Sequence, residues 1–477
     1  YHFSPPSLLL HDPAGLCWWQ GKYHLFYLSG RGKGHAVSDD LVHWQDLPVL
    51  PPAFSGGTGQ LWADGDRVIT GWASGKHDEI SLATATDPLL LDWVEHSENP
   101  VYGPGVLQPG NDNFLWREGE TYYMTVRRTQ RFEPGLDFLS GRPTSLELLR
   151  CRSADLTTWE WLGNFLEDID YTQPGDDCAC NNVLPIGDGK HLILWFSHRS
   201  GAQYYVGTFD RERAHLDIGS HGLMNFGPNA RGGLHAPSGF VDPKGRCIGI
   251  WNILENWPQE GWNEVMSLPR QFSLIDYESF ASPERAALFA PLRIEPIAEL
   301  EALRFDPVRV EDVVIPANGE TVLSEVKGKA MELEVVIDPM EAREVGIKVL
   351  RSPDGEEETT ITLFMHSWLS WLPDGPRQLA LDVSRASLHP DVRSRSPEMG
   401  YLYLEDGEPL RLRVYIDRSL VEVFANGRQS LTLRCRPTRE DSSGVSVFAR
   451  GRDAKLVTLD AYQMRSVWPE LKEKEGE

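Results

Sequence analysis

Five stretches of this chain share one pattern, in which a turn centred on Gly or Asp precedes a strand of alternating or continuous apolar residues. These stretches are Gly21–Ser29, Asp66–Ser74, Gly119–Arg127, Gly189–His198 and Gly245–Ile253. Their first residues lie about 45 to 70 residues apart, a spacing that suits repeated units with insertions. Short strands bounded by turn residues are typical of all-β proteins. The recurrence predicts an all-β fold that begins with a five-bladed β-propeller.

A second repeat consists of a polar turn that ends in Trp. It occurs at Ser38–Trp44, Thr86–Trp93 and Ser153–Trp159. We expect each copy to connect two strands of a blade, and we expect the three Trp side chains to pack against the blades.

The last third of the chain shows a different arrangement. Residues 293–310 read as a linker, with a short helix expected after Pro296. Alternating strands follow, at Met331–Ile337, Glu358–Met365, Leu410–Ile416, Leu420–Phe424 and Val445–Ala449. This pattern predicts a C-terminal β-sandwich over residues 311–477, after a propeller domain over residues 1–292.

The net charge limits the partners of this protein. Asp and Glu number 70 against 46 Lys and Arg, a formal charge of −24, which disfavours binding to nucleic acid or to an anionic membrane surface. No apolar run approaches the roughly 20 residues that a membrane-spanning helix needs. The six Cys residues follow no disulfide or zinc pattern. The sequence begins at Tyr1 rather than Met, so it does not indicate a cellular compartment. It does not indicate an oligomeric state either.

Asp12 stands out near the N-terminus. It lies between apolar residues and a Pro/Gly turn, directly before the first strand of the repeat. A carboxylate in such a place either caps the turn or points into a pocket, where burial is costly unless the group has partners or a task. The residues alone leave both alternatives open.

Several motifs occur together, in order, along nearly the whole chain. They are Tyr1–Pro5, His11–Gly15, Gly34–Ser38, Asp40–Trp44, Phe54–Gly57, Ser267–Arg270 and Ile416–Phe424. In these motifs the chain resembles glycoside hydrolase family 32, the β-fructofuranosidases. The resemblance implies a five-bladed propeller with a β-sandwich. It also implies a retaining hydrolase or transglycosidase for fructofuranosides of the sucrose, fructan or fructooligosaccharide class, which needs no metal or organic cofactor.

The resemblance also assigns roles to carboxylates. Retaining hydrolysis needs a nucleophile and an acid/base on opposite sides of the scissile bond. Asp12 corresponds to the family nucleophile. Asp112, in the place of an Arg-Asp-Pro motif, corresponds to the transition-state stabiliser, although an Asx-turn would also explain it.

The acid/base is ambiguous. An ungapped alignment puts Ala179 where the family has Glu, and a two-residue shift puts Asp177 there instead. If Ala179 is the true match, the proton donor has been lost or moved, and Asp177, Asp176 and His235 are the candidates to replace it.

The expected sugar-binding residues differ from the family pattern as well. His11 and Ala14 replace two Asn residues, Leu28 replaces Gln, Asn111 replaces Arg, and His235 replaces an aromatic residue; Phe54 and Ser55 match the family. Several changed hydrogen-bonding groups imply a different substrate, a different reaction or none. The alternatives to a fructofuranosidase are therefore a glycosidase for another furanoside and a non-catalytic carbohydrate-binding protein.

Overall fold

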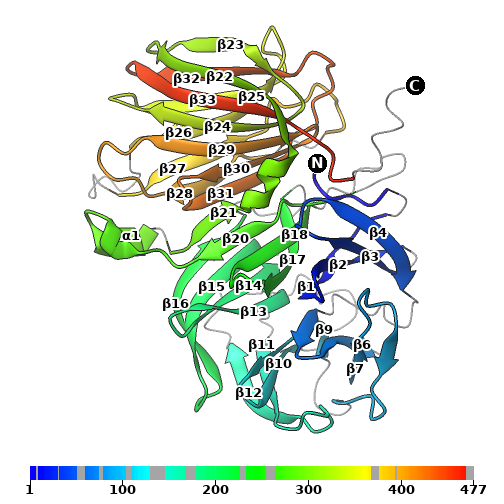
Figure 1. Ribbon diagram of the computed structural model, residues 1–477. Coiled ribbons are helices and arrows are strands. Elements are labelled where there is room, and N and C mark those ends of the chain that lie inside the picture. Colours follow the sequence, from blue (N-terminus) through cyan, green and yellow to red (C-terminus); the bar gives the residue numbers. More distant parts are fainter. Residues whose placement is uncertain are drawn as a thin grey trace. The chain divides into compact units, whose positions relative to one another are not determined.

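The computed structural model describes residues 1–6, 9–30, 32–50, 60–74, 79–103, 109–128, 145–166, 176, 178–198, 200–225, 233–253, 264–289, 291–366, 375–392 and 395–468. Contacts divide the chain into two compact units. One is built chiefly from Phe3–Leu223 and the strands that follow up to Arg270, and the other chiefly from Gln271–Val467. Nearly all regular structure in both units is β (Figure 1).

The first unit contains five antiparallel sheets in chain order. The first four consist of β1 (Pro13–Trp19), β2 (Lys22–Ser29), β3 (Gly32–Ser38) and β4 (Trp44–Leu50); β5 (Leu61–Asp64), β6 (Arg67–Ser74), β7 (Glu79–Ala85) and β8 (Trp93–Glu95); β9 (Pro109–Glu118), β10 (Thr121–Arg128), β11 (Ser145–Cys151) and β12 (Glu160–Leu166); and β13 (Ala179–Gly187), β14 (Lys190–Ser197), β15 (Gly201–Asp210) and β16 (His215–Leu223). The strands of the five-stranded fifth sheet that belong to this unit are β17 (Leu234–Val241), β18 (Cys247–Ile253) and β19 (Val265–Met266).

The first strands of these sheets form a closed ring. β1 contacts β5, β5 contacts β9, β9 contacts β13, β13 contacts β17, and β17 returns to β1. The five stretches that share the turn-and-strand pattern supply β2, β6, β10, β14 and β18, the second strand of each sheet. The predicted five-bladed propeller is therefore confirmed.

The Trp-containing repeat is a turn of one kind used in three blades. In each copy the carboxylate of Asp40, Asp87 or Asp155 accepts backbone N–H groups two to five residues further on. The following Leu41, Leu90 and Leu156 adopt φ values of 66°, 50° and 58°. Trp93 and Trp159 donate their indole N–H to the carbonyl of that Leu, at 2.8 and 3.0 Å. The three Trp side chains are buried or partly buried, which confirms their predicted packing role.

The second unit is a sandwich of two six-stranded sheets. It begins with β20 (Arg270–Ser273), η3 (Tyr277–Ser279), α1 (Pro283–Phe289), β21 (Arg293–Pro296) and η4 (Ala298–Leu303). One sheet has the order β22 (Arg304–Ile315), β33 (Ala454–Met464), β24 (Ala330–Asp338), β29 (Leu410–Asp417), β30 (Leu420–Ala425) and β31 (Gln429–Arg434). The other has the order β23 (Glu320–Lys327), β32 (Gly444–Arg450), β25 (Glu344–Arg351), β26 (Thr359–Phe364), β27 (Arg377–Asp382) and β28 (Glu398–Leu402). Aliphatic residues from both sheets form one core, as a β-sandwich requires.

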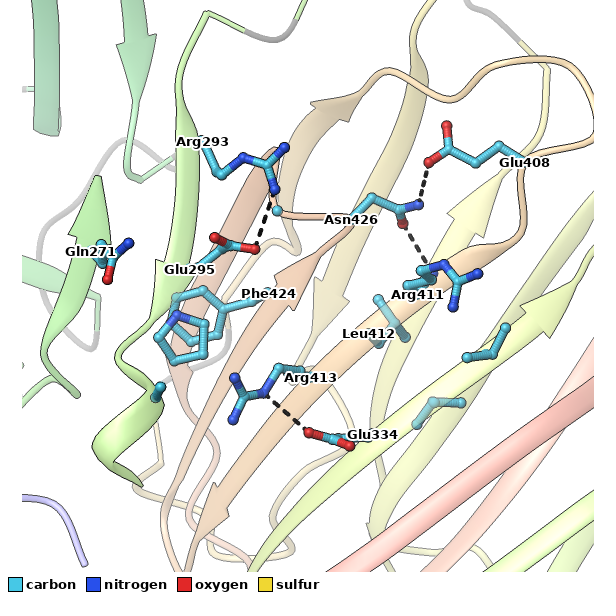
Figure 2. Close-up of a pocket in the computed structure, with 15 residues that line it drawn as sticks. Gln271, Arg293, Glu295, Glu334, Glu408, Arg411, Leu412, Arg413, Phe424 and Asn426 are labelled. Atoms are coloured by element: carbon cyan, nitrogen blue, oxygen red, sulfur yellow. Dashed lines mark hydrogen bonds and ion pairs between the residues drawn. The ribbon is translucent and has the colours of Figure 1, made fainter. Parts of the chain in front are cut away.

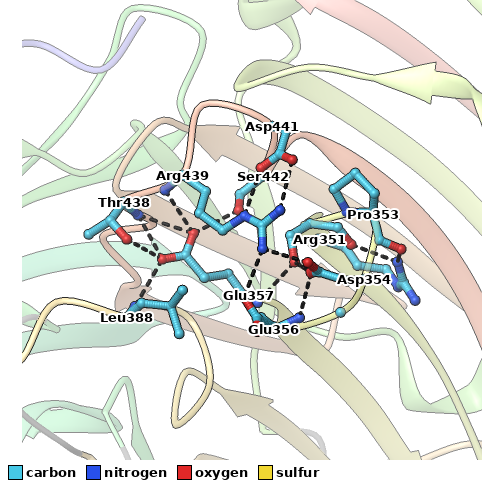
Figure 3. Close-up of polar contacts among 12 residues, drawn as sticks. Arg351, Pro353, Asp354, Glu356, Glu357, Leu388, Thr438, Arg439, Asp441 and Ser442 are labelled. Carbon is cyan, nitrogen blue, oxygen red and sulfur yellow. Dashed lines mark hydrogen bonds and ion pairs between the residues drawn. The ribbon is translucent and has the colours of Figure 1, made fainter.

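A buried carboxylate ties the connections of the second sheet together. Glu357 is fully buried and accepts hydrogen bonds from the backbone N–H groups of Leu388, Thr438 and Arg439 and from the Ser442 hydroxyl (Figure 3). Burial opposes the charge, but the hydrogen bonds outweigh it and lower the pKa of Glu357 to about 2. The loops that carry these donors therefore depend on an ionised Glu357.

We predict that Glu357→Gln destabilises the sandwich by about 3 kcal/mol at neutral pH, the free energy that corresponds to the lowered pKa. This contribution is fully present above the ordinary Glu pKa and is lost as the pH falls toward about 2. Urea unfolding at pH 7 and pH 3 measures it. Glu356→Gln is the matched control, because the Glu356 side chain is largely exposed beside Arg439. Equal losses of stability in the two variants would contradict the prediction.

Candidate active site

Polar side chains gather where the innermost strands of the propeller begin. Asp12 directly precedes β1, Gln60 directly precedes β5, Asp112 is the fourth residue of β9, and His235 is the second residue of β17. Side-chain contacts link these strand ends across the ring: Ser238 of β17 donates to Gln60 at 2.8 Å, and His235 lies 3.0 Å from Asp12. The start of the innermost strands is therefore the candidate active site.

The backbone places Asp12 at this end of the ring. The His11 N–H donates to the Leu28 carbonyl and the Leu28 N–H donates to the Asp12 carbonyl, so the residues before β1 extend the pairing with β2. Gly15 has φ 133°, and a Cβ there would lie 2.5 Å from Leu61 Cγ. Only glycine permits this approach of β1 to the neighbouring blade.

The Asp12 carboxylate bonds to the fifth blade rather than to its own turn. Its Oδ1 atom lies 3.0 Å from His235 Nδ1 and accepts the Asn252 amide at 3.0 Å. About a quarter of the Asp12 side chain stays exposed. Burial disfavours the charged form of His235, but Asp12, with help from Asn252 and Glu264, outweighs this effect and raises the pKa of His235.

Asp112 occupies a more enclosed position. It is buried in β9, its Oδ2 atom lies 3.3 Å from Arg127 Nε of β10, and its Oδ1 atom lies 3.9 Å from the Cys180 thiol of β13. The guanidinium offsets the cost of burying this carboxylate. Asn111 also lies in β9, but its side chain falls outside the part that the structure describes.

Asp176 and Ala179 belong to the segment that enters β13. Asp176 is fully buried and accepts hydrogen bonds from Ser197 (2.7 Å) and Ser200 (2.5 Å). Ala179 is buried in β13 opposite Phe196. Asp177 falls outside the described residues, as do the predicted binding residues Phe54 and Ser55.

The backbone on both sides of Ala179 is strained. Cys178 and Cys180 have φ values of 43° and 51°, and Ala236, next to His235, has φ 49°. Non-glycine residues rarely adopt this left-handed conformation and tend to cluster at functional sites. The strained residues here all lie at the start of an innermost strand.

Sequence reasoning missed two residues of the site. Asn252 of β18 contacts both Asp12 and His235, and the fully buried Glu264, which precedes β19, accepts the Asn252 amide at 2.9 Å. An acidic residue directly before Val265 and Met266 was the available signal, because a carboxylate in an apolar stretch needs a partner.

No metal centre emerges from the described residues, which contain no cluster of three or more His, Cys, Asp or Glu side chains able to hold an ion. The six Cys side chains are buried and form no disulfide. In the same described ranges, no helix is long and apolar enough to cross a membrane.

A separate cavity of about 580 Å³ lies in the sandwich unit (Figure 2). Its charged side chains pair with one another: Arg413 lies 3.7 Å from Glu334, and Arg293 lies 3.5 Å from Glu295. None of the predicted site residues that the structure describes lines this cavity.

Comparison with known proteins agrees with the fold. Residues 2–283 match the N-terminal domain model of glycosyl hydrolases family 32, and residues 299–463 match its C-terminal model. The chain is 26% identical to a levanase of Bacillus subtilis (strain 168), covering 98% of this chain and 70% of the levanase. It is 25% identical to a bifunctional 6(G)-fructosyltransferase/2,1-fructan:2,1-fructan 1-fructosyltransferase of Allium cepa, covering 98% and 87%.

The fold has solved counterparts. The crystal structure of fructan 1-exohydrolase IIa from Cichorium intybus superimposes with a TM-score of 0.80 at 20% identity, covering 98% of this chain and 97% of that one. Because the N-terminal family model alone spans more than half of the sequence, this chain belongs to glycosyl hydrolases family 32.

Proposed function

We propose that this protein is a retaining glycoside hydrolase or transglycosidase that acts on a β-fructofuranoside-like substrate through a covalent glycosyl-enzyme intermediate. The observation that carries the proposal is the Asp12 carboxylate, held from the fifth blade by His235 and Asn252 yet still partly exposed. The printed names of relatives add support, since they include levanases, fructosyltransferases and β-fructofuranosidases. One solved relative, a variant of fructan 1-exohydrolase IIa, forms a complex with 1-kestose.

In this reaction Asp12 attacks the anomeric carbon, and the bond to the leaving oxygen breaks as an acid protonates that oxygen. Water, or an acceptor hydroxyl for transfer, then releases the sugar from Asp12 and gives its proton to the same acid/base. Asp112 takes the role of stabiliser, because a carboxylate bound to the sugar hydroxyls strengthens its contacts as positive charge develops on the ring. Its burial beside Arg127 supports a fixed position for this carboxylate.

Asp177 is our choice for the acid/base. Asp176 already accepts two hydroxyl hydrogen bonds in a fully buried position, which disfavours it as a donor to substrate. His235 directs Nδ1 toward the nucleophile, so it fits a binding role better. Asp177 directly precedes Cys178, whose φ of 43° is a left-handed conformation of the kind that clusters at functional sites.

His11, Asn111 and His235, with Phe54 and Ser55, would then bind the sugar. His11 replaces a family amide, and His235 replaces another aromatic residue. Both imidazoles change the shape of the sugar site and the hydrogen bonds that it can form. We expect these changes to decide which furanoside the enzyme accepts, because unpaired polar groups in a buried site reject the wrong sugar strongly.

One observation favours a second candidate, a non-catalytic carbohydrate-binding protein. Ala179, which an ungapped alignment places at the family Glu, is buried against β14 and has no ionisable side chain. If no neighbouring residue supplies the proton, the scaffold would bind sugar without cleaving it.

We predict that the protein releases sugar from at least one of sucrose, inulin, levan and difructose anhydrides. Asp12→Ala should reduce this release to below about one-thousandth of the wild-type rate, because the nucleophile is lost. Chromatography of the products measures release, and Asp39→Ala, at an exposed carboxylate of the same blade, is the control. If Asp12→Ala still releases sugar, Asp12 is excluded as the nucleophile. If the wild type releases sugar from none of these substrates, the result would favour a non-catalytic carbohydrate-binding protein.

A second prediction concerns the proton donor. Asp177→Asn should slow cleavage of a natural sugar by about 10² to 10⁴-fold but spare an activated aryl β-fructofuranoside, whose leaving group needs no proton. Steady-state rates on both substrates measure the difference. Asp176→Asn is the matched neighbour and should show no such selectivity; equal losses on both substrates in Asp177→Asn would overturn the assignment.

A further inference from the structure

Glu264 is a buried carboxylate of which only one oxygen accepts a hydrogen bond from the described residues. Its side chain is fully buried before β19. The Oε2 atom accepts the Asn252 amide at 2.9 Å, whereas Oε1 accepts no hydrogen bond from any residue in the described part of the chain. Oε1 lies 3.6 Å from Nδ1 of His11, an ion-pair distance.

The hydrogen bonds around Glu264 define where the protons lie. The Asn252 amide nitrogen faces two carboxylates, Asp12 and Glu264, so its two N–H groups are both used as donors. His235 Nδ1 faces two acceptor oxygens, one on Asp12 and one on Asn252, at 3.0 Å each. Nδ1 of His235 must therefore carry a proton. Glu264 thus fixes the orientation of the amide that holds Asp12.

We propose that Glu264 is a positioning residue, which orients Asn252 against Asp12 and holds His11 protonated so that His11 donates a charged hydrogen bond to the sugar bound at Asp12. The contact of His11 with a sugar and the activity readout rest on the proposed function. The charge state of His11 is a property of the free protein.

The electrostatics of the cluster support a protonated His11. A buried carboxylate oxygen without a donor is costly, and a proton on His11 Nδ1 would supply that donor. The interaction with Glu264 across the 3.6 Å separation, with the charge of Asp12, exceeds the opposing effect of burial and raises the pKa of His11. Glu264 and Asp12 are the charged groups that act on His11 from its described surroundings.

The exposure of His11 would let a protonated imidazole reach a bound sugar. About half of its side chain is exposed, while Nδ1 faces the buried Glu264. Nε2, on the opposite side of the ring, is then the nitrogen available to a bound sugar. A donor of this kind forms stronger hydrogen bonds than the neutral amide that the family has at this position.

The test is the titration of His11 measured by NMR in the free protein, with His11→Asn used to assign its signal. In Glu264→Gln, which keeps the shape of the side chain and removes its charge, the midpoint should fall toward that of an ordinary His. Glu264→Asp should retain part of the shift. Glu118→Gln is the control, because Glu118 contacts His191 rather than His11. An unchanged His11 midpoint in a folded Glu264→Gln would overturn the proposal.

Activity supplies a second readout. Because the protonated form of His11 is the competent one, kcat/KM falls as the pH rises through the His11 pKa. Glu264→Gln should move the midpoint of this His11-dependent loss to lower pH, and His11→Asn should remove the loss and leave the pH dependence that the acid/base imposes. The change that Glu264→Gln makes to the pH profile should be smaller in the His11→Asn background than in the wild type; an equal change in both would contradict a role through His11. Absence of activity in the wild type would overturn the proposed function, while the NMR titration would still decide the role of Glu264.

Discussion

The contact of Asp12 with His235 and Asn252 is the interaction on which both the propeller and its site depend. Asp12 precedes the first innermost strand, whereas His235 and Asn252 belong to the fifth blade. The side chain that we propose as the nucleophile therefore also joins the first and last blades of the ring. Loss of blade closure would misplace the nucleophile, so the stability of the ring and the geometry of the site are coupled.

The remaining site residues occupy equivalent places in the other blades. The innermost strands bring Gln60, Asp112 and the entry of β13 to the same end of the ring. Each blade thus contributes polar groups at the beginning of its first strand. The strained backbone of Cys178, Cys180 and Ala236 lies at the same strand ends. A ring of rigid strands suits chemistry that requires carboxylates held at a fixed separation.

The sequence predicted the blades well because their signals are local. Each second strand combines a turn with an apolar run, and each Asp–Leu–Trp turn repeats in order. The motifs also singled out Asp12 and Asp112, which the structure places directly before β1 and within β9. They did not single out Asn252 and Glu264, because Asn252 contacts Asp12 only when the ring closes, and Glu264 contacts Asn252 only when β18 and β19 pair. The choice between Ala179 and Asp177 also depends on register within one short segment, which residue types alone do not determine.

The central claim is that Asp12 forms a covalent bond to the sugar. The most direct measurement is acid quenching of the enzyme during turnover of an activated aryl β-fructofuranoside, followed by peptide mass mapping. Our account predicts a single adduct of one fructosyl residue on the peptide that contains Asp12, absent from Asp12→Ala. An adduct on a different residue, or active turnover with no adduct on Asp12 under conditions in which breakdown of the intermediate limits the rate, would contradict it.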